Sequence, residues 1–254
     1  MFKKALLISL GLAACMSASA AKLSAESSAM RAPAPATPGQ HAYVLVLENR
    51  REVMEDGKKE NYEGVTRELY GIPIARATAD KTPMNQYLGE RLRIGFQNAG
   101  WQSSYQPSAK GTRADALVQP LEMQKDGLAL VVDMRDWNYD FGGFSPEFAY
   151  DVTLSVYDQQ KTLLARREFK GIDPMPTGGW KHFKKRYAEL YQTLFERFFA
   201  DPDIAAALRG TPTLASVAAG TVEDRLRKLH SLLDQGLIDQ VTFDREQQRI
   251  SAEL

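Results

Sequence analysis

The sequence predicts an α+β fold, in which two helices pack on one face of an antiparallel sheet and a small two-helix appendage follows. Apolar residues alternate with period two in several segments between residues 41 and 169. Two longer segments, 80–100 and 180–201, repeat apolar residues every three or four positions instead. The resulting order of strand, helix, strand meander and helix favours an antiparallel sheet with its helices on one side. We expect this domain to span residues 41–208.

The first elements follow from composition and period. Residues 41–47 are β-branched and aromatic, which predicts a strand, whereas charged residues dominate 49–70 and indicate an exposed loop or ragged hairpin. An amphipathic helix is expected from Asp80, ending at Gly100, and a polar loop should continue to about residue 112. Its apolar positions are Met84, Tyr87, Leu88, Leu92, Phe96 and Ala99.

Four further strands and a second helix are expected. The strands are 116–123, 128–137, 148–157 and 163–169, with a hairpin-type Asp126-Gly127 pair after the first of them. The second helix runs from Trp180 and ends near Asp201-Pro202, because proline cannot continue the turn. Its apolar positions are Trp180, Phe183, Tyr187, Leu190, Leu194 and Phe198.

This layout resembles the YajG-like family of bacterial lipoproteins. The resemblance rests on residues 88–101, ending in Gly100-Trp101, on Ala114-Asp115-Ala116-Leu117, on the segments 148–158 and 163–171, and on the helix from Trp180. It covers roughly residues 41–208 and is one of pattern more than identity. The charged 49–70 segment departs from it. The layout also resembles, more weakly, auxiliary lipoproteins of ABC-type envelope transporters.

The N-terminus carries the features of an export signal. Lys3 and Lys4 precede an apolar run of about ten residues, roughly half the length that spans a bilayer. The run ends in Leu-Ala-Ala-Cys, which resembles the lipobox of bacterial lipoproteins. The resemblance implies a signal peptide over residues 1–14, cleavage after Ala14, and acylation of Cys15, for example by palmitate. Ordinary secretion with cleavage after Ala20 is the alternative.

Cys15 is the only cysteine of the chain, so no intramolecular disulfide explains it. Met16 follows it rather than Asp, which by resemblance to Gram-negative sorting rules implies the outer membrane. Residues 15–40 are rich in Pro, Ala and Ser, and we expect a tether, either of tuned length or a plain linker. Without residues 1–14 the chain has 30 basic and 32 acidic residues, which disfavours nucleic acid as a partner.

A second linker over 209–220 leads to a predicted helical hairpin over 221–254. Leu226, Leu229 and Leu233 lie on one face of its first helix, and the second carries Phe243 and Ile250 after a break at Asp234-Gln235-Gly236. The segment resembles the SHOCT short C-terminal domain, in which an oligomerisation or interaction role is suspected. About 30 residues cannot build a self-sufficient core, so this apolar stripe should pack on the main domain, on a second copy or on a partner. The candidate interaction residues are Leu226, Leu229, Leu233, Ile238, Phe243 and Ile250.

Catalytic and metal motifs are weak. His41, His182 and His230 have no His or Cys at ligand spacing, so we expect no zinc site and no cofactor. Asp133, Asp136 and Asp140 form the best carboxylate cluster, but their spacing is not that of a calcium loop, and on a strand 133 and 136 should face opposite sides. A solvated hairpin tip is the simpler interpretation.

An aromatic group lies in the same region. Its members form either a surface lip for recognition or part of the core, and the core is the favoured interpretation because aromatic rings are usually buried. The candidate lip residues are Trp137, Tyr139, Phe141 and Phe144.

The sequence therefore predicts a non-enzymatic outer-membrane lipoprotein facing the periplasm, acting in binding or assembly. Its partners would be the membrane, through Cys15, and a protein or a second copy, through the C-terminal hairpin. The alternative is an auxiliary lipoprotein of an ABC-type envelope transporter that handles a lipid or other apolar ligand. An apolar cavity between sheet and helices would favour that alternative. A hydrolase would instead need a nucleophile and a base within hydrogen-bond reach.

Overall fold

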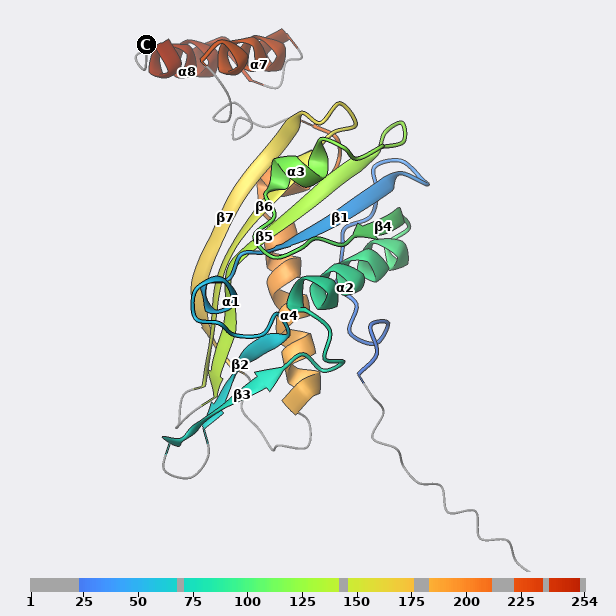
Figure 1. Ribbon diagram of the computed structural model, residues 1–254. Coiled ribbons are helices and arrows are strands. Elements are labelled where there is room, and N and C mark those ends of the chain that lie inside the picture. Colours follow the sequence, from blue (N-terminus) through green and yellow to red (C-terminus); the bar gives the residue numbers. More distant parts are fainter. Residues whose placement is uncertain are drawn as a thin grey trace, which may run out of the picture.

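The computed structural model describes residues 23–67, 71–141, 146–175, 183–211, 222–234 and 238–251 (Figure 1). Its elements are β1 (His41–Glu48), α1 (Arg51–Met54), β2 (Tyr62–Arg67), β3 (Pro73–Ala77), α2 (Met84–Asn98), β4 (Gln102–Gln106), α3 (Ala114–Val118), β5 (Leu128–Phe141), β6 (Glu147–Tyr157), β7 (Leu163–Pro174), α4 (Phe183–Phe199), α5 (Pro202–Ala207), α7 (Val222–Asp234) and α8 (Gln240–Ser251).

The described strands form one curled sheet centred on β5 (Figure 1). On one side of β5, β6 and then β7 follow in antiparallel pairs. On the other side, β5 pairs in parallel with β1 over its first part and with β2 over its last part, and β4 and β3 lie outside these two. The α+β class is confirmed, but the sheet is mixed rather than antiparallel. The crossover through α2 brings β4 alongside β1 in the same direction, as parallel pairing requires.

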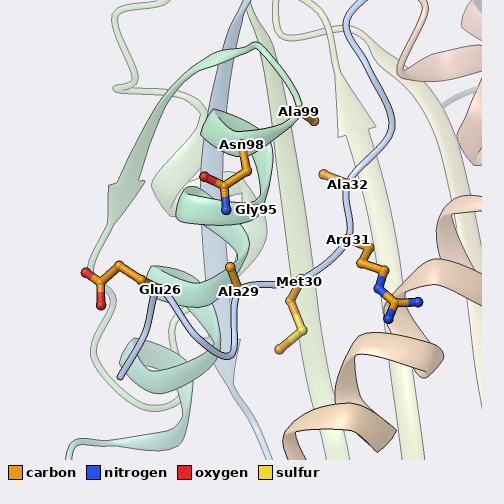
Figure 2. Close-up of a pocket in the computed structure, with 8 residues that line it drawn as sticks. All are labelled: Glu26, Ala29, Met30, Arg31, Ala32, Gly95, Asn98 and Ala99. Carbon is orange, nitrogen blue, oxygen red and sulfur yellow. The ribbon is translucent and has the colours of Figure 1, made fainter. Parts of the chain in front are cut away.

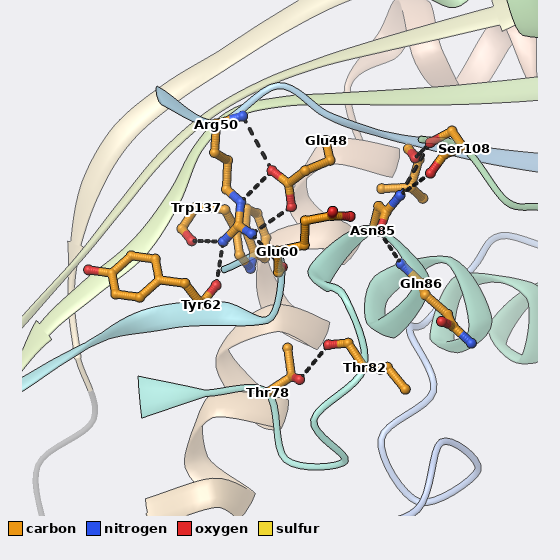
Figure 3. A network of polar contacts seen from close by, with 11 residues as sticks. Glu48, Arg50, Glu60, Tyr62, Thr78, Thr82, Asn85, Gln86, Ser108 and Trp137 are labelled. Atoms are coloured by element: carbon orange, nitrogen blue, oxygen red, sulfur yellow. Dashed lines mark hydrogen bonds and ion pairs between the residues drawn. The ribbon is translucent and has the colours of Figure 1, made fainter. Parts of the chain in front are cut away.

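A buried ion pair holds in place the connection from β1 to β2, residues 49–61 (Figure 3). The side chains of Glu48 and Arg50 are 0% and 1% exposed, and Arg50 Nη2 lies 2.6 Å from Glu48 Oε2. The same guanidinium donates to the carbonyl oxygens of Tyr62 at 2.6 Å, Glu60 at 3.0 Å and Trp137 at 3.4 Å. One side chain therefore joins the end of β1 to the start of β2 and to β5.

Short polar segments account for most differences from the sequence prediction. Where an exposed loop or ragged hairpin was expected over 49–70, the described residues form α1 and β2, anchored by buried Val53 and Tyr62. Strand β2 pairs antiparallel with β3 in an irregular register, which agrees with the hairpin. The polar loop expected after Trp101 contains edge strand β4, held by backbone pairing with β1 rather than by apolar alternation. The strand expected over 116–123 is wrong. Helix α3 stands there and buries only Val118.

The C-terminal end of α4 is as predicted, but Pro202 begins a new helix, α5. The Asp201 side chain accepts hydrogen bonds from the backbone N–H groups of Asp203 at 3.0 Å and Ile204 at 3.2 Å, which caps the N-terminus of α5. Proline suits the first turn because its missing N–H would have no intrahelical partner there.

A β-bulge in β5 overturns the prediction for the acidic residues. The register shifts between Met134 and Asp136, so that Arg135 and Asp136 together lie opposite Asp151. Asp133 and Asp136 therefore share the face of the sheet opposite the main core, although strict alternation predicts opposite faces. This face is polar from Asp133 onward, whereas at the other end it buries a second apolar cluster that includes Tyr43, Leu45 and Val131. Among the described residues no group that could hold a metal ion is found. The three aspartates accept hydrogen bonds from separate partners, Asp133 from Asn49, Asp136 from Asn138 and Asp140 from Arg67.

The main core lies between the sheet and helices α2 and α4, which cover the same face as predicted. Trp137 and Tyr139 point into it and are 0% and 1% exposed, and Trp137 meets the ring of Phe148 edge-on with centroids 4.9 Å apart. The favoured core interpretation is therefore confirmed for these two rings and the surface lip is wrong for them, because β5 continues through them and the bulge at Arg135 shifts its alternation so that both face inward. Phe141 is half-buried against the core, and Phe144 lies outside the described residues.

The C-terminal hairpin packs its apolar stripe on itself. Helices α7 and α8 bury Leu229, Phe243 and Ile250 of the predicted set, together with Leu232. The remaining predicted residues, Leu226, Leu233 and Ile238, are partly buried against this cluster. Lys228 Nζ donates to the carbonyl oxygen of Leu163 at 3.0 Å, which links the hairpin to the start of β7.

Candidate functional site

The most distinctive site is an N-terminal strap, residues 28–33, which lies in the seam between α2 and α4. The sequence assigned these residues to a tether, but Ser28, Ala29 and Met30 are only 1%, 8% and 2% exposed. Met30 belongs to the main core. The tether prediction is therefore wrong for this segment, because the small residues fit closely against α2 while a single methionine supplies the buried apolar group.

Hydrogen bonds fasten the strap to both helices. The Met30 N–H donates to the Arg91 carbonyl oxygen at 3.0 Å, and Arg91 Nε donates to Ser28 Oγ at 2.8 Å, both on α2. From α4, Gln192 Nε2 donates to the Ala29 carbonyl oxygen at 2.8 Å. Beyond α2, the Trp101 indole N–H donates to the Pro33 carbonyl oxygen, also at 2.8 Å. An ion pair of 3.0 Å between Arg31 and Glu196 adds an exposed contact to α4. The strap thus bridges the two helices that cover the sheet.

Gly95 makes this close approach possible. A Cβ atom on Gly95 would lie 2.1 Å from the Met30 carbonyl oxygen, a separation that real Cβ atoms do not adopt. Glycine in a helix interior costs about 1 kcal/mol relative to alanine, so its presence here has a steric reason. Gly89 in the same helix similarly accommodates the ring of Tyr105, which a Cβ would approach to 2.2 Å.

Arg91 is the buried charge of the site. Its guanidinium lies 3.3 Å from the centre of the Tyr87 ring, and its Nη1 is 3.4 Å from Asp80 Oδ2. Burial raises the pKa of Asp80, but hydrogen bonds from Thr82 and the charge of Arg91 outweigh it, so the pKa is lowered overall. The strap therefore packs on a helix whose buried cation is balanced by a neighbouring carboxylate and an aromatic ring.

A shallow groove of about 300 Å³ runs between the strap and α2 (Figure 2). Glu26 lies at its edge, where the backbone N–H of Glu26 and the Ser24 side chain donate to its carboxylate and lower its pKa. Half of its eight lining residues are alanine or glycine, and its polar groups come from Glu26, Arg31 and Asn98. The lining residues are Glu26, Ala29, Met30, Arg31, Ala32, Gly95, Asn98 and Ala99.

The histidines do not form a catalytic group in the described part of the chain. His41 Nε2 lies 3.0 Å from Ser104 Oγ, and burial lowers the pKa of His41. No carboxylate among the described residues hydrogen-bonds to its ring, so the orienting partner of a triad is missing there. His230 packs against Phe243 in the hairpin, and His182 lies outside the described residues.

Sequence reasoning missed the strap. The signal available in the sequence was Gly95, a glycine inside a strongly periodic helix, since such a glycine usually has a packing reason. Ala14 and Cys15 lie outside the described residues, so the anchor remains a prediction. Among the described residues no helix combines the length and apolarity needed to cross a bilayer.

No protein-family model matches this chain, and no curated protein matches it. Solved structures similar to it include a DUF330 protein of Xanthomonas campestris, with 14% identity, covering 72% of this chain and 95% of that chain, at a TM-score of 0.44. Lipoprotein GNA1162 of Neisseria meningitidis matches with 7% identity over 63% of this chain and 99% of that chain, at a TM-score of 0.30. A hypothetical protein of Chlamydia trachomatis matches with 10% identity over 68% and 97%, at a TM-score of 0.34. These similarities are too low to transfer a function.

Proposed function

We propose that this chain is a non-enzymatic, lipid-anchored binding or assembly module on the periplasmic face of a bacterial outer membrane, held close to the bilayer by its N-terminal strap. The observation that carries the proposal is the depth at which the strap is built into the domain. Twelve residues separate Cys15 from Ser28, the first strongly buried residue of the part of the chain that the structure describes. Even fully extended, they reach at most about 45 Å. An acylated Cys15 would therefore confine the α2–α4 seam to the vicinity of the membrane.

The packing of the core gives no support to the alternative of a transporter auxiliary protein that encloses an apolar ligand. In the described part of the chain, large rings fill the layer between the sheet and α4. Their side chains are each at most 1% exposed, which leaves that layer solid rather than hollow. These rings are Trp137, Phe148, Tyr191, Phe195 and Phe198. Binding would thus take place on an outer surface.

Energy transfer to the bilayer tests this proposal. A fluorescent donor is attached to the acylated protein through Gln97→Cys, an exposed position of α2. The protein is placed in phosphatidylethanolamine–phosphatidylglycerol vesicles whose lipid headgroups carry fluorescent acceptors. We expect strong transfer, and a large loss when a 20-residue Gly/Ser segment is inserted between Lys22 and Leu23.

The same segment inserted after Thr211 is the matched control, and it should leave the transfer unchanged because it follows the domain. Equal energy transfer from the protein with and without the N-terminal insertion would mean that the strap does not limit the distance between α2 and the bilayer.

A further inference from the structure

Strand β7 leaves one edge of the sheet available for pairing. It is 12 residues long and pairs with β6 alone among the described strands. Its first residues lie beside the C-terminal hairpin, where Lys228 contacts Leu163, so the edge considered for pairing is residues 165–174. An unpaired strand edge presents backbone N–H and C=O groups that can bind another strand. Charged side chains on an edge strand usually oppose such pairing. Because β7 carries charges of both signs, their arrangement decides whether a second β7 is repelled or attracted.

The charges of β7 are complementary under a two-fold rotation. Glu168 and Lys170 flank Phe169 on the polar face of the sheet and are 59% and 72% exposed. In an antiparallel pair of two β7 strands centred on Phe169, Glu168 of each copy lies opposite Lys170 of the other. Opposite charges in such directly facing positions stabilise a strand pair, whereas like charges destabilise it.

From this arrangement, we propose that two copies of this chain pair through β7 into a dimer with one continuous sheet. The two-fold axis passes at Phe169, and the interface is isologous, as closed dimers require. Each Glu168 already contacts Arg135 at 2.8 Å, and each Lys170 contacts Asp151 at 3.2 Å. The dimer therefore extends an existing ladder of opposite charges across the new pair of strands. The inference concerns β7 only and does not depend on the lipid anchor.

The other face of the strand is compatible with this register. The ring of Phe169 stacks on Phe198 with centroids 4.5 Å apart, so the two Phe169 side chains would meet beside the core rather than in open solvent. Gly171 would lie opposite Arg167, whose guanidinium turns toward Asp201 at 3.1 Å. No pair of like charges faces across the two-fold axis in this register.

Reversing the charges of Glu168 and Lys170 tests the interface in the full-length protein in detergent. Light scattering and sedimentation equilibrium measure its association. We expect a dimer for the natural sequence. Glu168→Lys alone and Lys170→Glu alone should each raise the dissociation constant at least about tenfold, because each change creates two like-charged pairs between the copies. Each change also places a like charge beside Arg135 or Asp151 within its own copy, so circular dichroism checks that every variant is folded. The double variant Glu168→Lys/Lys170→Glu should restore the dimer, and a mixture of the two single variants should form a mixed dimer.

The matched control is Arg166→Glu, a charge reversal on the same exposed strand that lies opposite Ile172 and should not weaken the dimer. A natural protein that is monomeric at all concentrations would overturn the proposal. So would a dimer indifferent to both single changes, which would place the interface elsewhere, for example on the C-terminal hairpin. A dimer lost in the single variants and not restored in the double variant would overturn the register.

Discussion

Replacing Arg50 by Met should lower the free energy of unfolding by about 3–5 kcal/mol, the effect expected when one partner of a buried ion pair is removed. The carboxylate of Glu48, which is fully buried, would lose its cation. The carbonyl oxygens of Glu60 and Tyr62 would also lose a donor. Chemical denaturation of the two proteins, followed by circular dichroism, measures the difference.

Two comparisons separate the cost of leaving a buried charge without its partner from the cost of losing a side chain. Arg67→Met removes a pair with Asp140 whose side chains are 41% and 45% exposed, and should cost at most about 1 kcal/mol. Glu48→Met combined with Arg50→Met should cost less than Arg50→Met alone, since no unpaired charge remains buried. If Arg50→Met were no more harmful than Arg67→Met, the pair would not fix the passage from β1 to β2.

Gly95→Ala should release the N-terminal strap and destabilise the domain. In an isolated helix this substitution stabilises by about 1 kcal/mol, so the sign of the change reports the tertiary contact. Here the new Cβ would collide with the Met30 carbonyl oxygen, and the strap backbone would have to move away. We expect a lower melting temperature and faster amide hydrogen exchange at residues 28–33, with α2 still helical.

Gln97→Ala is the control for Gly95→Ala, since it changes an exposed position on the same helix without a clash. Glutamine is already a good helix former, so this change should alter the stability by less than about 0.5 kcal/mol and leave the strap protected. A Gly95→Ala protein that is more stable than the natural one, with a strap that still resists exchange, would mean that the strap does not dock as described.

Local periodicity predicted the elements whose burial is one-sided and long. The alternation in the second half of β5 and the first half of β6 and the three- and four-residue spacing of α2 and α4 each follow from one buried face. The parallel pairing of β1 with β5 was not accessible, because a single strand pattern does not state its neighbour's direction. The bulge at Arg135 was equally hidden, since one added residue shifts the face of all that follow.

Composition was the weaker guide for the candidate site. Residues 28–33 have the Pro and Ala content of a linker, yet hydrogen bonds to Arg91 and Gln192 and one buried methionine hold them in place. The apolar pattern of the hairpin likewise did not identify what its stripe packs against. Its Leu229 and Phe243 were expected to pack on the main domain, on a second copy or on a partner, but they belong to one buried cluster within the hairpin.

Metabolic labelling with palmitate, combined with membrane fractionation of the natural protein and a Cys15→Ser variant, tests the central claim most directly. The lipid-anchor account predicts that the natural protein carries label and sediments with the outer membrane, and that Cys15→Ser loses both the label and the membrane association. Normal maturation of the Cys15→Ser protein by cleavage after Ala20, with unchanged membrane fractionation, would contradict it.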